Sequence, residues 1–431
     1  MGLYCTRQSA LLASIFRFMR NKARVGMTGL FCLLVAHNAS GQQLSFEQHM
    51  AKLLALLADH PSIGLSRQNE LVQTLNADAA MGLPNPSFTL GFNNLPVDDP
   101  TAFDRFLPSN MSLEFRQTLP SSDTRNATKS TGMARAEQTR WERKVMLAQL
   151  EKRLIIALAE RQRITEATSI LQQKMGLLAE MQDWLEGSMQ GGESQYSRLI
   201  EIEAQRGQIN ERTVALRGED LRWQAELRAL VGHVPSIELP NKISPRLWNE
   251  DPATLLPVQV ALSRVNVAQS EVTVKESDFG WDYAVGFAYQ VREESDRFDG
   301  DDWFTLKLTA SVPLWSDSNQ KPKLAAAHAA VTAATAYRDQ QLREARLEYD
   351  NAMAALDTSR SLVEALLERE KSLLYLQTSN RRRYEAGEIG LEPVIKAALQ
   401  QADLRLTLSK QRAQLAKATA SINALLIEEE S

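Results

Sequence analysis

Residues 281–313 read WDYAVGFAYQVREESDRFDGDDWFTLKLTASVP, two alternating stretches joined by an acidic loop. Successive side chains of a β-strand point to opposite faces, so the second stretch would carry apolar and polar residues on separate faces: Phe304, Leu306, Leu308 and Ala310 against Thr305, Lys307, Thr309 and Ser311. An alternating segment of about 9–11 residues has the length of a transmembrane β-strand. We therefore predict two membrane-length strands, Tyr283–Val291 and Phe304–Val312.

The first half of the chain repeats this arrangement. Ser87–Asn93 and Met111–Leu119 form an equivalent alternating pair around the polar and acidic loop 97–109. Equivalent residues keep a nearly constant offset: 195 residues separate Gly91 from Gly286, Gly192 from Gly387 and Leu230 from Leu425, and 193 residues separate Pro120 from Pro313. An offset that holds over about 140 residues indicates an internal duplication.

Long helices are predicted after each strand pair. Residues 121–234 and 323–392 contain no proline, which would break a helix interior, and both are rich in Ala, Leu, Gln, Glu and Arg. A helix from Pro322 to Tyr384 would be about 95 Å long at about 1.5 Å per residue. Its many alanines would let neighbouring helices approach closely, as in a coiled-coil wall. Each repeat is therefore predicted to be a strand pair followed by a helical hairpin.

These patterns divide the chain into five parts. The predicted order is a leader (1–41), N-terminal helices (42–82), a first repeat (83–234, with strand pair 86–120 and helical hairpin 121–232), a linker with a helix (235–280), and a second repeat (281–431, with strand pair 281–313 and helical hairpin 318–428).

The leader has the three parts of a secretory signal peptide. An apolar stretch, Val25–Ala36, is followed by the small residues Ala39–Gly41, so we predict cleavage before Gln42. The apolar stretch is about 12 residues long, too short to span a bilayer as a stable helix. The alternative is an N-terminal anchor, and Met19 is an alternative start. The stretch follows a positively charged region made by Arg17, Arg20, Lys22 and Arg24.

Both cysteines, Cys5 and Cys32, fall within this leader. A processed chain would have none, so disulfides and cysteine metal sites are not expected. Phe31 precedes Cys32 where a lipoprotein signal needs Ala, Gly or Ser, so lipidation is not expected either. A processed chain without cysteine suits the envelope of a Gram-negative bacterium.

Composition and motifs exclude several classes of function. Aromatic residues make up only 6% of the chain, which favours long helices over a compact mixed core. The formal net charge of -4 gives no basic footprint for nucleic acid. No hydrolase, metalloprotease or phosphate-loop motif is present, so no catalytic residue, metal site or cofactor is expected, and the protein is not predicted to be an enzyme. The histidines are scattered: His37, His49, His60, His233 and His328.

Four strands cannot close a barrel in a membrane, because an open sheet edge in lipid leaves backbone groups without hydrogen bonds. If the strands are transmembrane, the chain must therefore assemble with copies of itself. Three copies would supply twelve strands, an even number that leaves an open lumen. The alternative is that the strand pairs are β-hairpins packed on soluble helices.

Two local signatures, with this order of elements, resemble the outer-membrane efflux (TolC-like) family. A strand ends in proline before each long helix, at Thr118-Leu119-Pro120 and at Val312-Pro313-Leu314-Trp315. The second hairpin turns and restarts at Tyr384-x-x-Gly387-x-Ile389-Gly390-Leu391-x-x-Val394. The resemblance covers about residues 44–428, and Asn93-Asn94-Leu95-Pro96 with its acidic loop resembles the heavy-metal branch of the family.

The resemblance implies an α+β membrane protein of the outer membrane: a homotrimer whose 12-stranded β-barrel continues into a periplasmic α-helical barrel. It implies a passive exit duct, docked on an inner-membrane transporter of the RND type through a periplasmic adaptor. Heavy-metal cations would be the cargo if the branch is correct. Two alternatives stay open, an outer-membrane duct for protein secretion and a periplasmic coiled-coil adaptor or scaffold.

In this family the turn of each helical hairpin forms the periplasmic tip, which contacts the adaptor and closes the channel. The turns here are Gln190–Gln195 and Ala386–Pro393, whose glycines would adopt positive φ. The resemblance assigns adaptor contact to Gly191, Gly192, Gly387, Ile389, Gly390 and Leu391.

The charges beside these turns depart from the family pattern, which often places an acidic ring there. Pro393 and Lys396 occupy those positions in the second repeat. The candidates for a charged ring, or for ion pairs that hold the tip shut, are Arg198, Glu201, Glu392 and Lys396.

Overall fold

The structure is a computed structural model that describes residues 46–101, 109–190, 196–240, 243–294, 296 and 299–427. Residues 45–431 form one compact unit. The predicted signal peptide, with Cys5 and Cys32, lies outside the described residues, as do Gly191 and Gly192.

The predicted order of strand pairs and long helices is confirmed. The first half contains helices α1 (Phe46–Ala58) and α2 (Pro61–Ala79), strands β1 (Ser87–Asn93) and β2 (Asn110–Leu119), and helices α3 (Ser122–Gln190) and α4 (Tyr196–Val231). The second half contains the 3-10 turn η1 (Pro252–Thr254), α5 (Leu256–Ser277), β3 (Asp282–Val291), β4 (Trp303–Ser311), α6 (Gln320–Glu385) and α7 (Glu392–Asn423). Because α2 and α5 also begin 195 residues apart, the duplicated unit includes the helix before each strand pair.

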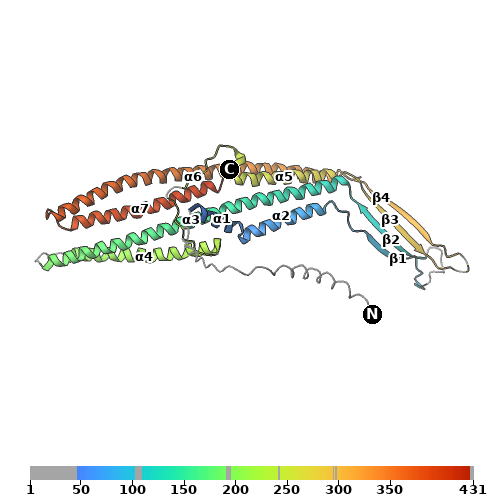
Figure 1. Cartoon of the computed structure of the whole chain (residues 1–431). Helices are drawn as coiled ribbons and strands as arrows, with labels where there is room; N and C mark the ends of the chain where they lie inside the picture. The colour runs from blue at the N-terminus through green and yellow to red at the C-terminus, as the bar shows by residue number, and fades with distance from the viewer. Residues whose placement is uncertain are drawn as a thin grey trace, which may run out of the picture. The chain divides into compact units, whose positions relative to one another are not determined.

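The helices form one layer in which the two longest, α3 and α6, run in the same direction with other helices between them (Figure 1). Two shorter helices fill the space between them, α5 near the strands and α7 farther away, and both contact α3 and α6. On the other side of α3 lie α2 near the strands and α4 farther away. The edges of the layer are therefore α6 on one side and α2 with α4 on the other.

Helix α3 buries an apolar side chain at every seventh position. These residues are Ile164, Leu171, Leu178 and Leu185, and α4 opposes them with Ile202, Ile209 and Leu216. Ile395 of α7 joins the same cluster. A seven-residue repeat of buried apolar side chains is the packing of a coiled coil, which explains how this part of the first hairpin is stabilised.

The linker between the repeats, residues 232–255, is tied to three helices. Its backbone N–H groups donate to one side chain on each: from Leu239 to Gln162 of α3 (2.9 Å), from Arg246 to Asn423 of α7 (2.8 Å) and from Trp248 to Tyr349 of α6 (3.1 Å). The linker therefore fastens both hairpins, near the middle of the long helices α3 and α6 and at the C-terminal end of α7.

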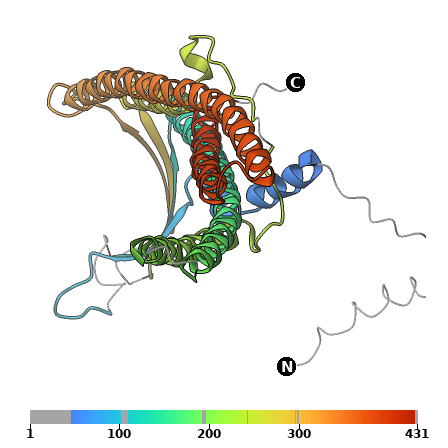
Figure 2. The ribbon, with the colours of Figure 1, turned by 90° about the vertical axis from the view of Figure 1, so that its left-hand side faces the viewer.

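The four strands form one antiparallel sheet in the order β1-β2-β3-β4, so the two strand pairs join through β2 and β3. The register pairs Phe88 with Phe115, Phe115 with Phe287 and Phe287 with Leu306. Seen end on, the helices form a curved layer (Figure 2). Among the described residues, no helix has the length and apolarity needed to cross a membrane.

Candidate functional site

The turn of the second hairpin lies at the end of the helices opposite the sheet (Figure 1). Gly387 has a φ of 76°, and its N–H donates to the Tyr384 carbonyl (2.9 Å) while the N–H of Glu388 donates to the Arg383 carbonyl (2.9 Å). These two bonds define a Schellman motif, the common glycine-dependent end of a helix. The expected positive φ is confirmed at Gly387, which ends α6 and starts the reversal.

The expectation of a positive φ at Gly390 is wrong, because this glycine has another role. Its φ is not in the left-handed region, and a Cβ atom there would lie 3.3 Å from Cζ2 of Trp184 in α3. Gly390 therefore lets the second turn approach the end of α3. No local pattern in the sequence points to Trp184, since the contact joins helices far apart in the chain.

The residues after Gly390 anchor the start of α7 in the hairpin core. Leu391 packs against the cluster that contains Leu185 and Ile202, and Ile395 lies within it. Ile389, in the turn itself, is half-buried. The turn is thus attached to the first hairpin by apolar contact.

An ion-pair cluster joins the two hairpins at the same place. Arg198 of α4 donates from Nη1 to Oε2 of Glu392 in α7 (2.6 Å), and Nζ of Lys396 lies 2.6 Å from Oε1 of the same carboxylate. The hydrogen bond from Lys396 is the main cause that holds the pKa of Glu392 below its usual value, and Arg198 lowers it further. Glu392 therefore stays ionised and bridges two cations from different helices.

Glu201, the fourth predicted charge, is not part of this cluster. Its side chain is exposed and accepts a hydrogen bond from Gln205 (3.3 Å), one turn along the same helix. Pro393 lies in the first turn of α7, and its carbonyl accepts a hydrogen bond from Asn380 of α6 (3.2 Å). The structure therefore brings together three of the four predicted charges, Arg198, Glu392 and Lys396.

A second ion-pair cluster, which the sequence did not indicate, lies near the middle of α3. Glu160 of α3 is buried, accepts from Arg163 Nε (2.6 Å) and pairs with Lys417 of α7, while Arg163 also pairs with Glu219 of α4. Burial by itself would raise the pKa of Glu160, but the hydrogen bonds from Lys417 and Arg163 hold it below its usual value. This cluster fixes α3, α4 and α7 against one another.

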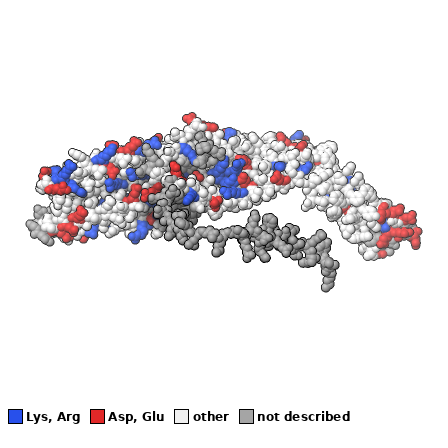
Figure 3. All heavy atoms as spheres, viewed as in Figure 1, with Lys and Arg blue, Asp and Glu red and all other residues white. Residues whose placement is uncertain are grey.

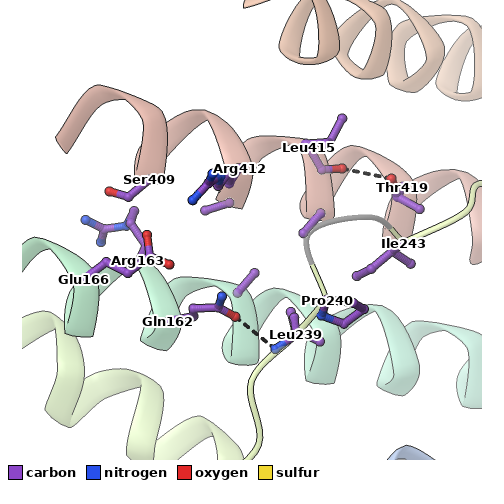
Figure 4. Close-up of a pocket in the computed structure, with 13 residues that line it drawn as sticks. Gln162, Arg163, Glu166, Leu239, Pro240, Ile243, Ser409, Arg412, Leu415 and Thr419 are labelled. Atoms are coloured by element: carbon purple, nitrogen blue, oxygen red, sulfur yellow. Dashed lines mark hydrogen bonds between the residues drawn. The ribbon is translucent and has the colours of Figure 1, made fainter. Parts of the chain in front are cut away.

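A small cavity lies beside the second cluster, between α3, α7 and the linker (Figure 4). It measures about 40 Å³ and is lined by Gln162, Arg163, Leu239 and Arg412, among others. Figure 4 shows the hydrogen bond from Leu239 N–H to Gln162 that closes one side. A space of this size holds a few waters and no larger ligand.

The sheet has two chemically different faces. Small residues of β3 on one face, such as Ala284 and Ala288, are buried among the polar side chains of neighbouring strands. The other face is apolar across all four strands and exposed: Phe88, Leu90, Phe92, Leu113, Phe287, Tyr289, Phe304, Leu306 and Leu308. Apolar exposure on this scale marks a surface that another apolar phase or chain covers.

The strand loops add a third feature. Acidic side chains gather at the loop end of the sheet, next to a nearly uncharged region over the strands (Figure 3). They include Asp98, Asp99, Glu293, Glu294, Asp299, Asp301 and Asp302. Within the described ranges, no group of three or more His, Cys, Asp and Glu could hold a metal ion.

Solved structures of outer-membrane channels share this fold. The open state of the MtrE outer membrane channel from Neisseria gonorrhoeae matches 87% of this chain and 88% of its own, with a TM-score of 0.71 and 12% identity. The CmeC outer membrane channel from Campylobacter jejuni matches 89% of this chain and 88% of its own, with a TM-score of 0.68 and 12% identity. The outer membrane protein VceC from Vibrio cholerae matches 87% of this chain and 95% of its own, with a TM-score of 0.67 and 14% identity.

At these identities the likeness establishes the fold: long helical hairpins with four antiparallel strands, as predicted. No protein-family model matches the sequence, and no curated protein sequence is significantly similar to it.

Proposed function

We propose that this chain is one subunit of a homotrimeric outer-membrane channel of a Gram-negative bacterium, a passive exit duct and not an enzyme. The observation that carries the proposal is a continuous apolar face on a sheet with two open edges, β1 and β4. An unpaired backbone group in lipid costs several kcal/mol, so both edges must pair with other copies. Three copies of four strands give a closed barrel of twelve.

The helix layer supports the same assembly. Its two edges carry exposed large apolar side chains: Leu65, Leu71 and Leu75 on α2, Ile200, Val214 and Leu221 on α4, and Leu347, Leu362 and Tyr375 on α6. Because the two edges are different surfaces, contact between them is head-to-tail, and on a curved layer such contacts close a ring.

Cell fractionation tests this proposal. We expect the protein in the detergent-extracted outer-membrane fraction, migrating as a trimer that dissociates on heating. Recovery in the soluble periplasm would refute the channel and favour the alternative of a coiled-coil adaptor or scaffold.

The proposed partners are a periplasmic adaptor and an inner-membrane transporter of the RND type, which supplies the energy that a passive duct lacks. We assign adaptor contact to the two hairpin turns, with Gly191 and Gly192 in one and Gly387 to Leu391 in the other. A photo-crosslinking residue at Ile389 tests this in cells. The expected product contains a periplasmic adaptor, and crosslinks confined to other copies of this chain would contradict the assignment.

We further propose that the ion pair between Arg198 and Glu392 holds the hairpin ends together in the closed channel. The pair links the first hairpin to the second across 2.6 Å. We expect Arg198→Ala to raise the conductance of the reconstituted channel. Glu201→Ala is the matched control, because this exposed carboxylate accepts its hydrogen bond from Gln205 of its own helix and, among the described residues, takes part in no ion pair. Equal conductance of wild type and Arg198→Ala would show that the ion pair does not hold the channel closed.

For the cargo we propose heavy-metal cations, supported by the resemblance of Asn93–Pro96 and its acidic loop to that branch of the family. Deletion of the gene is expected to sensitise cells to copper, zinc or silver. Sensitivity to drugs but not to metals would indicate that the duct exports drugs instead. Unchanged tolerance together with a lost exoprotein would favour the protein-secretion duct.

A further inference from the structure

The polar face of the sheet carries two cations at one height. The register places Ser87, Arg116, Gly286 and Lys307 in a single row across the four strands. Directly paired residues point to the same face of a sheet, so Arg116 and Lys307 share the polar face. Glu114 lies on the same face, two residues from Arg116 along β2.

Because Gly286 has no side chain, the side chain of Lys307 can extend over β3 to reach β2. Nζ of Lys307 lies 3.2 Å from Oε2 of Glu114, although β3 separates their strands. A Cβ atom at Gly286 would lie 3.4 Å from Cβ of Lys307 and 3.8 Å from Oε1 of Glu114, so the bridge passes directly over this glycine. Arg116 is exposed and has no ion-pair partner in the part of the chain that the structure describes. Two cations and one carboxylate leave a net charge of +1 at this height.

Other charges on this face are too distant to cancel it. Asp282 lies four residues from Gly286, about 13 Å along the strand, and its Oδ1 accepts the N–H of Ser121 (3.2 Å). The acidic loop begins at Asp302, five residues from Lys307 and about 17 Å away. The Debye length is about 8 Å at physiological ionic strength, so salt largely screens the charges of Asp282 and the acidic loop from Arg116 and Lys307.

We propose that Arg116, Lys307 and Glu114 form an anion-attracting band on the wall of the duct, which concentrates small carboxylate- or phosphate-bearing solutes. The inference rests on the proposed function, because the polar face lines a lumen only in the assembled barrel. There, each of the three copies contributes one such band to the wall at the same height.

Cysteine labelling measures the electrostatic potential at the band even when the periplasmic end of the channel is closed. Thr305→Cys lies in the next row of the polar face, opposite Ala288, and Leu306→Cys is its matched control on the apolar face. Both are made in a chain whose Cys5 and Cys32 are replaced by serine. Outer membranes are treated with anionic and cationic methanethiosulfonate reagents of similar size, and the ratio of the two labelling rates is compared with that of free cysteine.

We expect the ratio at Thr305→Cys to favour the anionic reagent by about threefold over free cysteine. Arg116→Gln and Lys307→Gln should each lower it, Glu114→Gln should raise it, and Lys371→Gln on α6 should leave it unchanged. Each variant is first checked for the heat-dissociable trimer, and exposed Arg116 supplies a substitution that leaves the Lys307–Glu114 bridge intact.

A ratio that does not respond to Arg116→Gln or Lys307→Gln would overturn the band while leaving the channel in place. Labelling of Leu306→Cys as fast as Thr305→Cys would instead show that the apolar face is not in lipid, which would refute the proposed function. The two failures are therefore distinguishable in one experiment.

Discussion

The long helices α3 and α6 are equivalent in sequence position but differ in burial. Ile164, Leu171, Leu178 and Leu185 of α3 are all buried, whereas the positions 195 residues later in α6 are Ser359, Leu366, Leu373 and Asn380, of which only Ser359 is buried. Helix α3 has neighbours on both sides, and α6 has them on one side only. Within one chain, therefore, neighbouring helices cover both sides of α3 but only one side of α6. This agrees with the proposed ring, in which the next copy covers α6.

The largest expected effect tests this difference directly. Leu178→Ala removes a side chain that is 1% exposed and should cost about 3 kcal/mol, because its cavity is closed on all sides. Leu373→Ala, its half-buried equivalent, should cost about 1 kcal/mol in the dissociated chain. Denaturant unfolding in detergent measures both. A similar cost for the two variants would contradict the difference in burial between α3 and α6. A larger cost for Leu373→Ala in the assembled oligomer than in the dissociated chain would indicate that another copy covers α6.

The second ion-pair cluster also belongs to only one repeat, because Ala355 stands 195 residues after Glu160. Glu160→Gln should cost about 2 kcal/mol at neutral pH, since Arg163 and Lys417 lose a buried partner. The pKa of Glu160 is lowered in the folded chain, so its contribution is complete above the unfolded pKa and is lost as the pH falls through the folded pKa.

Thermal unfolding measured between neutral and acidic pH tests whether the contribution of Glu160 to stability falls with falling pH. The wild type should lose stability as carboxylates protonate, and the difference between wild type and Glu160→Gln should shrink with falling pH. Glu166→Gln is the control, because this half-buried carboxylate has no ion pair within the described residues. A difference that stays constant with pH would show that Glu160 acts through packing alone.

The smallest expected effect concerns the turn of the second hairpin. Gly387→Ala should cost about 1 kcal/mol, because alanine is strained at the φ of 76° although open space surrounds the position. Gly218→Ala, in the exposed interior of α4, should instead stabilise by about 0.5–1 kcal/mol. The two thermal midpoints should move in opposite directions, and a rise for Gly387→Ala would mean that the turn does not require its left-handed backbone.

The two strand pairs show how the repeats diverged. The backbone is duplicated, but 195 residues after Ser112, Glu114 and Arg116 the chain has Lys307, Thr309 and Ser311. Each repeat therefore contributes different members of the band, and the Lys307–Glu114 bridge exists because β2 and β3 join the two pairs into one sheet.

Much of the fold was predictable from local pattern. Alternation over 304–312 specified a strand whatever its neighbours, and the absence of proline over 121–234 permitted a long helix. The site was less predictable. Arg198, Glu392 and Lys396 were identified as charges near the turns, but their joint contact depends on two hairpins meeting, as does the contact of Trp184 with Gly390.

The sequence by itself determined the duplicated unit, the strands, the long helices and the glycine that ends α6, because each depends on a period or a backbone preference within one segment. Only the tertiary structure decided which helices lie at the edges, which carboxylates are buried in ion pairs, and which strands place Arg116 and Lys307 in one row. Those features depend on distances between segments far apart in the chain, and no local pattern encodes such distances.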